Sequence, residues 1–430
     1  MSAAQRPASA TAQWVSLTGA VGFVIAAMAT GTAEVPLALA SILCALATAG
    51  PMIAFDLLVH RVHLRPSTGL RAEATALAPR RIALKLAGFY ATIGLLALAY
   101  HVIPEYEHKR YEAFWAVVSL ALPTILVGAV PYFAWVDRHQ IEPRDRYWHM
   151  GSLLLGRLED VDRAKLRQHA LGWIIKGFYL PLMVSYFTNA VRNVWRIDHT
   201  TVFAHMPDLV TAVSRWSLAL DLAFVVIGYT LTLRILDSHI RSSNPFMYGW
   251  VATLILYQPF WGLIGKRYFA YNDGSNWADW FGDHGALLTV WGIAIILSKA
   301  GWAWANISFG CRFSNLTNRG VLTSGPYRFT KHPSYVCKNV SWWLLSVPFL
   351  SQEGPVTAAV HCGALLGVNL LYVIRAHAEE QHLSEDPRYV SYALWMEEHG
   401  VFRFLGRALP ALRYRPPDAG YTTTPDHHNG

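Results

Sequence analysis

Long apolar segments dominate this sequence and restrict what the chain can fold into. They are apolar throughout rather than striped at helical spacing, and each is close to the length of about 20 residues that a helix needs to cross a bilayer. The sequence therefore predicts an all-α, polytopic transmembrane bundle of about ten helices. The predicted crossings are residues 14–31, 35–59, 82–103, 114–136, 171–191, 216–236, 246–264, 286–307, 336–350 and 356–374.

The composition agrees with a membrane protein. Of the 430 residues, 53% are hydrophobic and only 15% are charged, whereas soluble proteins carry about 25% charged residues. An ordinary cytosolic protein is therefore excluded. The last two apolar segments, 336–350 and 356–374, are short and closely linked, so we expect a helical hairpin that is tilted or spans only part of the bilayer.

The positions of Lys and Arg predict the orientation. If the N-terminus is cytoplasmic, 25 of the 36 fall in cytoplasmic segments, seven fall outside and four fall within helices. Because cytoplasmic loops are enriched in Lys and Arg, we expect both termini inside. The net charge of +8 is spread between apolar segments, so it indicates topology and not a nucleic-acid site.

No metal site or disulfide framework is expected. The four cysteines, at positions 44, 311, 337 and 362, are scattered singly, and His60 and His63 lack the further ligands of a known metal motif. Asp56, Asp221 and Lys176 lie inside predicted helices. They mark a substrate route or simply reach water at helix ends.

The polar residues that suggest chemistry gather in two stretches, 312–338 and 375–414, both expected on the cytoplasmic side. Glycine and proline shape the first stretch into a loop, which exposes backbone groups to a ligand. Its aromatic and cationic side chains are closely spaced, although an interfacial connector would have the same composition. The side chains of interest are Tyr327, Lys331, His332 and Tyr335.

The second stretch begins directly after an apolar helix. Arg375 and Glu379 are four residues apart and therefore share a helical face, with Glu380 beside them. Adjacent carboxylates at the mouth of a membrane helix are costly unless they meet a cation or water. They indicate either a solvated helix end or a site for a cationic ligand. Tyr389 and Tyr392 follow, either covering a pocket or lying at the interface.

Together these elements resemble the C-terminal signature of the isoprenylcysteine carboxyl methyltransferase-like superfamily, which includes phospholipid N-methyltransferases. The resemblance covers roughly the last 120 residues and rests on the order and spacing of Gly-Pro-Tyr327, Lys331-His-Pro-Ser-Tyr335 and Arg375 with Glu379 and Glu380. It implies a methyltransferase that uses S-adenosyl-L-methionine from the cytoplasm and takes a lipid or lipid-like acceptor from the bilayer.

The resemblance also assigns residues. Arg375 would face the acceptor, and Arg375, His332 and Lys331 are the catalytic candidates. Lys331 stands where the family often has Arg, and Lys cannot make the planar two-pronged contact of Arg; Arg319 stands where the family often has His. The residues expected to bind the cofactor are Arg319, Gly320, Val321, Leu322, Tyr327, His332, Pro333, Ser334, Tyr335, Glu379 and Glu380.

Elementary chemistry is compatible with this assignment. Tyr327 and Tyr335 offer aromatic faces to a sulfonium cation, and Glu379 or Glu380 can accept hydrogen bonds from an ammonium or ribose hydroxyl. A carboxylate acceptor needs no general base, whereas an amine or thiol must lose a proton. His332 is the nearest group that could take this proton, although a structural hydrogen bond is its commoner role.

These expectations divide the chain into N-terminal transmembrane helices without an assigned role (1–285), a methyltransferase-like membrane core (286–415) and a disordered tail (416–430). The expected location is a bacterial inner membrane, with membrane lipids as partners. Two other functions fit part of the pattern: an NADPH-dependent reductase of the sterol reductase or 5α-reductase type, and a non-enzymatic transporter or lipid-binding protein.

Overall fold

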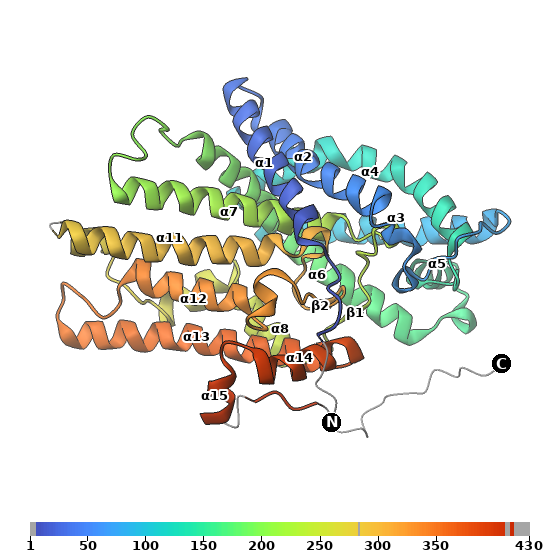
Figure 1. Ribbon diagram of the computed structural model, residues 1–430. Coiled ribbons are helices and arrows are strands. Elements are labelled where there is room, and N and C mark those ends of the chain that lie inside the picture. Colours follow the sequence, from blue (N-terminus) through green and yellow to red (C-terminus); the bar gives the residue numbers. More distant parts are fainter. Residues whose placement is uncertain (1–5, 283, 409–412, 417–430) are drawn as a thin grey trace.

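The computed structural model describes residues 6–282, 284–408 and 413–416 and is an all-α bundle (Figure 1). The predicted tail lies outside the described residues beyond Pro416. One two-stranded antiparallel ladder joins β1 (Ser242–Ser243) to β2 (Thr317–Asn318). The helices are α1 (Gln13–Thr32), α2 (Leu37–Leu58), α3 (Pro79–Val102), α4 (Glu112–His139), α5 (Arg146–Leu154), α6 (Arg163–Trp195), α7 (Met206–Thr230), α8 (Met247–Leu254), α9 (Lys266–Tyr268), α10 (Trp277–Phe281), α11 (Gly285–Ile307), α12 (Pro333–Ser346), α13 (Pro355–Leu383), α14 (Pro387–His399) and α15 (Arg403–Ala408).

Eight of the described helices are long and apolar enough to cross a membrane, so the chain is a multi-pass membrane protein. They are α1, α2, α3, α4 with the turn before it, α6, α7, α11 and α13. The predicted all-α polytopic fold is confirmed. The expected count of ten crossings is not confirmed, and the orientation of the termini stays a prediction.

Two of the predicted crossings are not single helices long enough to span a membrane. Residues 246–264 contain the eight-residue α8, followed by Pro259 and a π-helical turn, Trp261–Gly265. Residues 336–350 fall largely in α12, which has 14 residues and is therefore about 21 Å long. Since the apolar core of a bilayer is about 30 Å thick, α12 is too short to cross it upright.

Small residues allow several helices to approach closely. A side chain at Gly88 of α3 would meet the Tyr147 carbonyl of α5, and one at Gly151 of α5 would meet the Leu84 carbonyl of α3. Such contacts are typical of helices packed within a membrane, where backbones meet at small residues. Glycine at these two positions therefore sets the spacing of α3 and α5.

The centre of the bundle is formed by α6 and α7. Their facing sides contribute most of one large cluster of buried residues, which includes Tyr179, Phe187 and Tyr229. The Tyr179 and Tyr229 rings are stacked, with centroids 5.4 Å apart. In Figure 1, α11, α12 and α13 lie side by side below α7, with α14 beneath them.

A buried carboxylate ties the loops together at one end of the bundle. Asp237 is 1% exposed and lies 3.2 Å from Arg312, 3.4 Å from Arg241 and 3.7 Å from Arg65. The three cations come from three separate loop regions. Because a buried carboxylate needs such partners, Asp237 fixes these loops relative to one another.

Candidate active site

A cavity of about 360 Å³ lies between α6, α7, α11, α12 and α13 and is lined at one end by loops. This volume is within the range of about 300–1,000 Å³ that is typical of small-molecule sites. Both polar stretches of the sequence contribute to its wall. Seven of the predicted site residues line it, namely Tyr327, Lys331, His332, Ser334, Tyr335, Arg375 and Glu379.

The first stretch folds into a loop that ends in α12. Gly320 and Gly325 have φ angles of 106° and 61°, which favour glycine. Pro333 is the first residue of α12, a position where the missing N–H is not needed. The Tyr392 hydroxyl of α14 donates to the Tyr327 carbonyl at 2.6 Å. Tyr392 therefore supports the loop from behind and does not cover the cavity.

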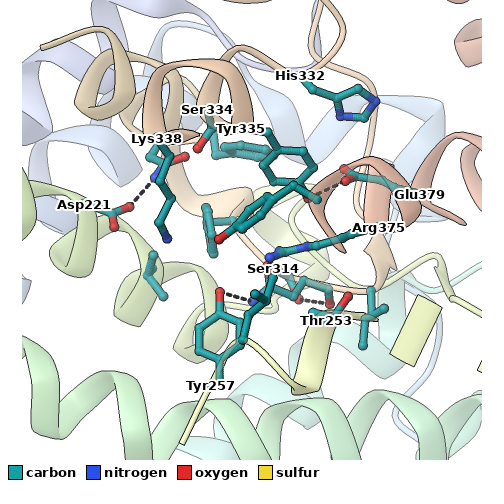
Figure 2. Close-up of a pocket in the computed structure, with 18 of the residues that line it drawn as sticks. Asp221, Thr253, Tyr257, Ser314, His332, Ser334, Tyr335, Lys338, Arg375 and Glu379 are labelled. Carbon is teal, nitrogen blue, oxygen red and sulfur yellow. Dashed lines mark hydrogen bonds between the residues drawn. The ribbon is translucent and has the colours of Figure 1, made fainter. Parts of the chain in front are cut away.

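The two adjacent glutamates point to different partners. The Tyr335 hydroxyl donates to Glu379 Oε2 at 2.7 Å (Figure 2). Glu380 instead lies 2.9 Å from His332 Nε2 and 3.0 Å from Lys331 Nζ. Only Glu379 of this pair lines the cavity, so its carboxylate is the one available to a ligand.

Lys331 and His332, which line the cavity, both contact other side chains of the protein. Lys331 Nζ also lies 3.3 Å from Glu397, which gives it two carboxylate partners. The His332 ring is stacked on Tyr335, with centroids 5.3 Å apart and planes inclined by 3°. Both side chains are therefore held in place by protein groups.

Arg375 lies deeper in the cavity. It is 8% exposed, and its guanidinium lies 4.9 Å from the centre of the Tyr335 ring and 5.8 Å from that of Tyr372. Its Nη2 donates to Asn315 Oδ1 at 2.5 Å. Among the described residues no carboxylate pairs with it, so Arg375 presents a positive charge to the cavity.

A second cation, Lys338, also lines the cavity. It lies on α12, one helical turn after Ser334. The Lys338 ammonium is 5.3 Å from the ring of Trp302, 5.5 Å from that of Trp342 and 6.0 Å from that of Tyr372. The described part of the chain supplies no hydrogen-bond acceptor to it. Lys338 was not among the predicted site residues, although its spacing of four from Ser334 places both on one face of α12.

The N-terminal helices complete the inner wall. Asp221 of α7 accepts a hydrogen bond from Asn306 of α11 and is labelled in Figure 2 among the residues around the cavity. It is 8% exposed, so its side chain does not reach water at a helix end, and the substrate-route interpretation stays a prediction. The other wall residues from α6 and α7 are Met183, Tyr186, Leu218, Leu222 and Val225.

Residues 319–322 lie away from the cavity lining. The Arg319 guanidinium donates to the carbonyls of five residues, at distances between 2.6 and 3.2 Å: Gly228, Leu231, Ser238, Cys311 and Phe313. Burial, together with the charge of Arg312, lowers the pKa of Arg319 to about 9. Val321 packs against Tyr389, Tyr392 and Tyr414. Gly320, Leu322 and Pro333 are likewise absent from the lining.

Several polar lining residues were not anticipated. Tyr257 and Gln258 lie in the segment that was predicted to be a plain crossing, and Asn315 lies in the first polar stretch without having been singled out. Pro259 was the available signal, because proline interrupts a membrane helix and frees backbone groups. The described residues contain no group of three metal-ligating side chains.

Comparison with known proteins shows a family similarity in this region. Residues 287–385 match the model of the isoprenylcysteine carboxyl methyltransferase (ICMT) family. The predicted resemblance is therefore confirmed for α11, α12 and α13 with the loop between them. No curated protein and no solved structure matches the chain. The ICMT match supports a membrane methyltransferase.

Proposed function

We propose that the chain transfers a methyl group from S-adenosyl-L-methionine to a lipophilic acceptor that enters from the bilayer. The observation that carries this proposal is the meeting of the two polar stretches of the ICMT-matching segment at one cavity. There, the hydrogen bond from Tyr335 to Glu379 joins residues 44 positions apart. The bound cofactor would supply an electrophilic methyl group on a sulfonium centre.

The residues at the loop end of the cavity suit this cofactor. Glu379 can accept hydrogen bonds from its ammonium or ribose hydroxyls. The rings of Tyr327, Tyr335 and Tyr372 offer faces that attract a sulfonium cation. Loop backbone groups near Ser334 can contact the adenine. Residues 319–322 and Pro333 would support this loop from behind.

The inner end of the cavity suits the acceptor. Its apolar wall, with Leu218, Leu222 and Met183, would hold a hydrocarbon chain. Arg375 and Lys338 would hold the polar group of the acceptor, since no carboxylate of the described residues lies at ion-pair distance from either cation. Lys331, which is bound to Glu380 and Glu397, would act as a positioning residue.

His332 would also act mainly by position. Its Nε2–H donates to the Glu380 carboxylate at 2.9 Å, so this nitrogen already carries a proton and only Nδ1 could accept one. Positioning the acceptor in line with the methyl group is the main help a protein can give this reaction. We infer that the cavity supplies such positioning, and that a general base is not its dominant contribution.

A binding titration tests the cofactor. Purified protein is titrated with S-adenosyl-L-methionine and, separately, with NADPH. The proposal predicts saturable binding of the first alone, with binding abolished by Glu379→Ala and by His332→Ala and retained by Glu398→Ala, which changes an exposed carboxylate. Binding of NADPH alone would favour the reductase, and unchanged binding in both variants would overturn the site assignment.

The proposal includes an orientation, with the loop end of the cavity and both termini in the cytoplasm of a bacterial cell. The excess of Lys and Arg in the corresponding loops supports it. Reporter proteins fused to either terminus test this arrangement. Activity typical of the extracytoplasmic side at either end would contradict it.

A further inference from the structure

A second cavity lies outside the segment that matches the ICMT family. It is small, with a volume of about 90 Å³. It is formed by the last turns of α4, the start of α5, the first half of α6 and the loop after α7. Its polar lining residues are Tyr132, Asp145, Arg146, Tyr147, Gln168, His169, Trp173, Lys176, Thr232, Arg234 and His239.

Three cations face this small space, and their hydrogen-bond partners are neutral. Arg146 donates to the carbonyls of Ile240 and Arg241 at 3.2 and 2.6 Å. Arg234 donates to the Thr68 carbonyl at 2.8 Å. Lys176 donates to the Thr232 hydroxyl at 2.8 Å and lies 4.2 Å from the centre of the Trp173 ring.

Among the described residues, one carboxylate lines the cavity, and it is bound to other groups. Asp145 Oδ1 accepts from two backbone amides at the start of α5, each at 3.1 Å. Its Oδ2 lies 3.5 Å from Lys85. Within the described ranges, no carboxylate lies at ion-pair distance from Arg146, Arg234 or Lys176. The positive charge of the cavity is therefore not balanced by these residues.

A histidine adds a hydrogen-bonding group without adding charge. His239 Nδ1 is buried and has no partner among the described residues. Burial and the neighbouring charges, with Arg234 the foremost, lower the pKa of His239 well below its usual value. Burial and the charge of Arg234 also lower the pKa of Arg146. At neutral pH the His239 ring is thus neutral and can donate one hydrogen bond.

Like charges that share a partly desolvated space repel one another, and a bound anion removes that cost. The guanidinium fork matches the oxygens of a phosphate, and lysine adds a point charge. We propose that this cavity binds a phosphoryl group through Arg146, Arg234, Lys176 and His239. Basic pockets between membrane helices near the surface commonly hold lipid head groups, so the phosphoryl group belongs to a phospholipid or to free phosphate.

Thermal unfolding of the delipidated full-length protein in a neutral detergent tests the proposal. Inorganic phosphate, phosphatidylglycerol and diacylglycerol are added in separate titrations. We expect phosphatidylglycerol to raise the unfolding temperature and diacylglycerol, which lacks phosphate, to have no such effect. If inorganic phosphate also raises the unfolding temperature, the site accepts the free ion. If inorganic phosphate has no effect, the ligand is the phosphodiester of a lipid. Equal responses to the two lipids would overturn the proposal.

Variants locate the effect in this cavity. Lys176→Met keeps most of the side-chain length and removes the charge, so we expect the apparent affinity for the phosphoryl ligand to fall about tenfold. Arg146→Gln should act similarly, whereas Arg146→Lys should retain part of the affinity. Arg163→Gln, an exposed position on the same helix as Lys176, is the matched control. Equal affinities in all four variants would overturn the proposal even if the protein binds phosphate.

Discussion

Lys338 is the residue that, under the proposed function, would contribute most to the choice of acceptor. Its ammonium lies among three aromatic rings, and lysine is costly to bury without a partner. The aromatic faces offset only part of that cost. The remaining attraction is available to a polar or anionic group on the acceptor.

We therefore predict that Lys338→Met raises the KM for the acceptor about tenfold and leaves the affinity for the methyl donor unchanged. Steady-state kinetics and donor titration measure the two effects. Lys299→Met is the control, because Lys299 also lies against Trp302, at 5.1 Å, but does not line the cavity. Loss of donor affinity with an unchanged KM for the acceptor would instead place Lys338 in the donor site.

Arg319 has a different task, since its guanidinium joins two separate loops and the end of α7. We predict that Arg319→Met lowers the free energy of unfolding by roughly 3–5 kcal/mol, because buried carbonyl oxygens lose their donors. Arg319→Lys should recover part of this. Unfolding measurements and donor titration of the folded fraction distinguish stability from binding. A stable variant that no longer binds the donor would show that Arg319 contacts the cofactor.

The contrast between Arg319 and Glu379 shows what the residues alone could reveal. Glu379 was assigned to the cofactor by the family resemblance, and a local pattern agreed with it, because Arg375 and a glutamate four positions later lie on one face of a helix. Arg319 was assigned to the cofactor by its place in a motif. Its partners Gly228 and Leu231 are about 90 positions away in the sequence, so local pattern could not identify them.

At the scale of elements, α6 begins with a well-formed cap. Asp162 Oδ1 accepts from the amides of Ala164 and Lys165 at 2.8 and 3.1 Å. The hydrogen bond from Lys165 foremost, with that from Ala164, holds the pKa of Asp162 below its usual value. A lowered pKa in the folded state means that the ionised form stabilises the helix at neutral pH.

We predict that Asp162→Ala lowers the free energy of unfolding by about 1 kcal/mol at pH 7. The sign of the pH effect follows from the lowered pKa: the contribution is present above about pH 4 and is lost as the pH falls through the folded-state value. Asp162→Asn should keep the cap at both pH values. Unfolding curves at pH 7 and pH 3 measure this. A difference between wild type and Asp162→Ala that grows toward low pH would contradict it.

The region of α8 explains why the predicted number of crossings was not confirmed. Hydropathy identifies residues 246–264 as apolar but does not report backbone form. Irregular backbone is tolerated at membrane depth where it is buried in protein or lines a cavity. Tyr257 and Gln258 do line the cavity. The information that separates this segment from a plain helix therefore lies in its surroundings.

At the scale of the whole molecule, the N-terminal helices are part of the site. Helices α6 and α7 supply the inner wall of the cavity, and the segment before α1 bonds to the loop of the first polar stretch. Ala10 donates its amide to the Val321 carbonyl at 2.9 Å, and Thr323 donates its hydroxyl to the Pro7 carbonyl at 2.7 Å. The division at residue 285 marks a change of sequence character and not a break in packing.

This arrangement gives the N-terminal helices a role that the sequence alone did not assign. A matching segment of about 100 residues supplies the candidate chemistry, while α7 supplies Asp221 and much of the apolar wall. The shape of the acceptor site would therefore depend on helices outside the ICMT match. Changes in these helices should alter the choice of acceptor more than the affinity for the donor.

Transfer of a labelled methyl group tests the central claim most directly. Purified protein is incubated with S-adenosyl-L-methionine labelled in its methyl group and with a total lipid extract, and the lipid fraction is analysed by mass spectrometry. We predict a lipid product heavier by one methyl group with wild-type protein and with Glu398→Ala, and at least about tenfold less with Tyr335→Phe, which removes the hydrogen bond to Glu379. Absence of a methylated lipid with wild-type protein, together with consumption of NADPH in a parallel incubation that contains NADPH in place of the methyl donor, would contradict the account.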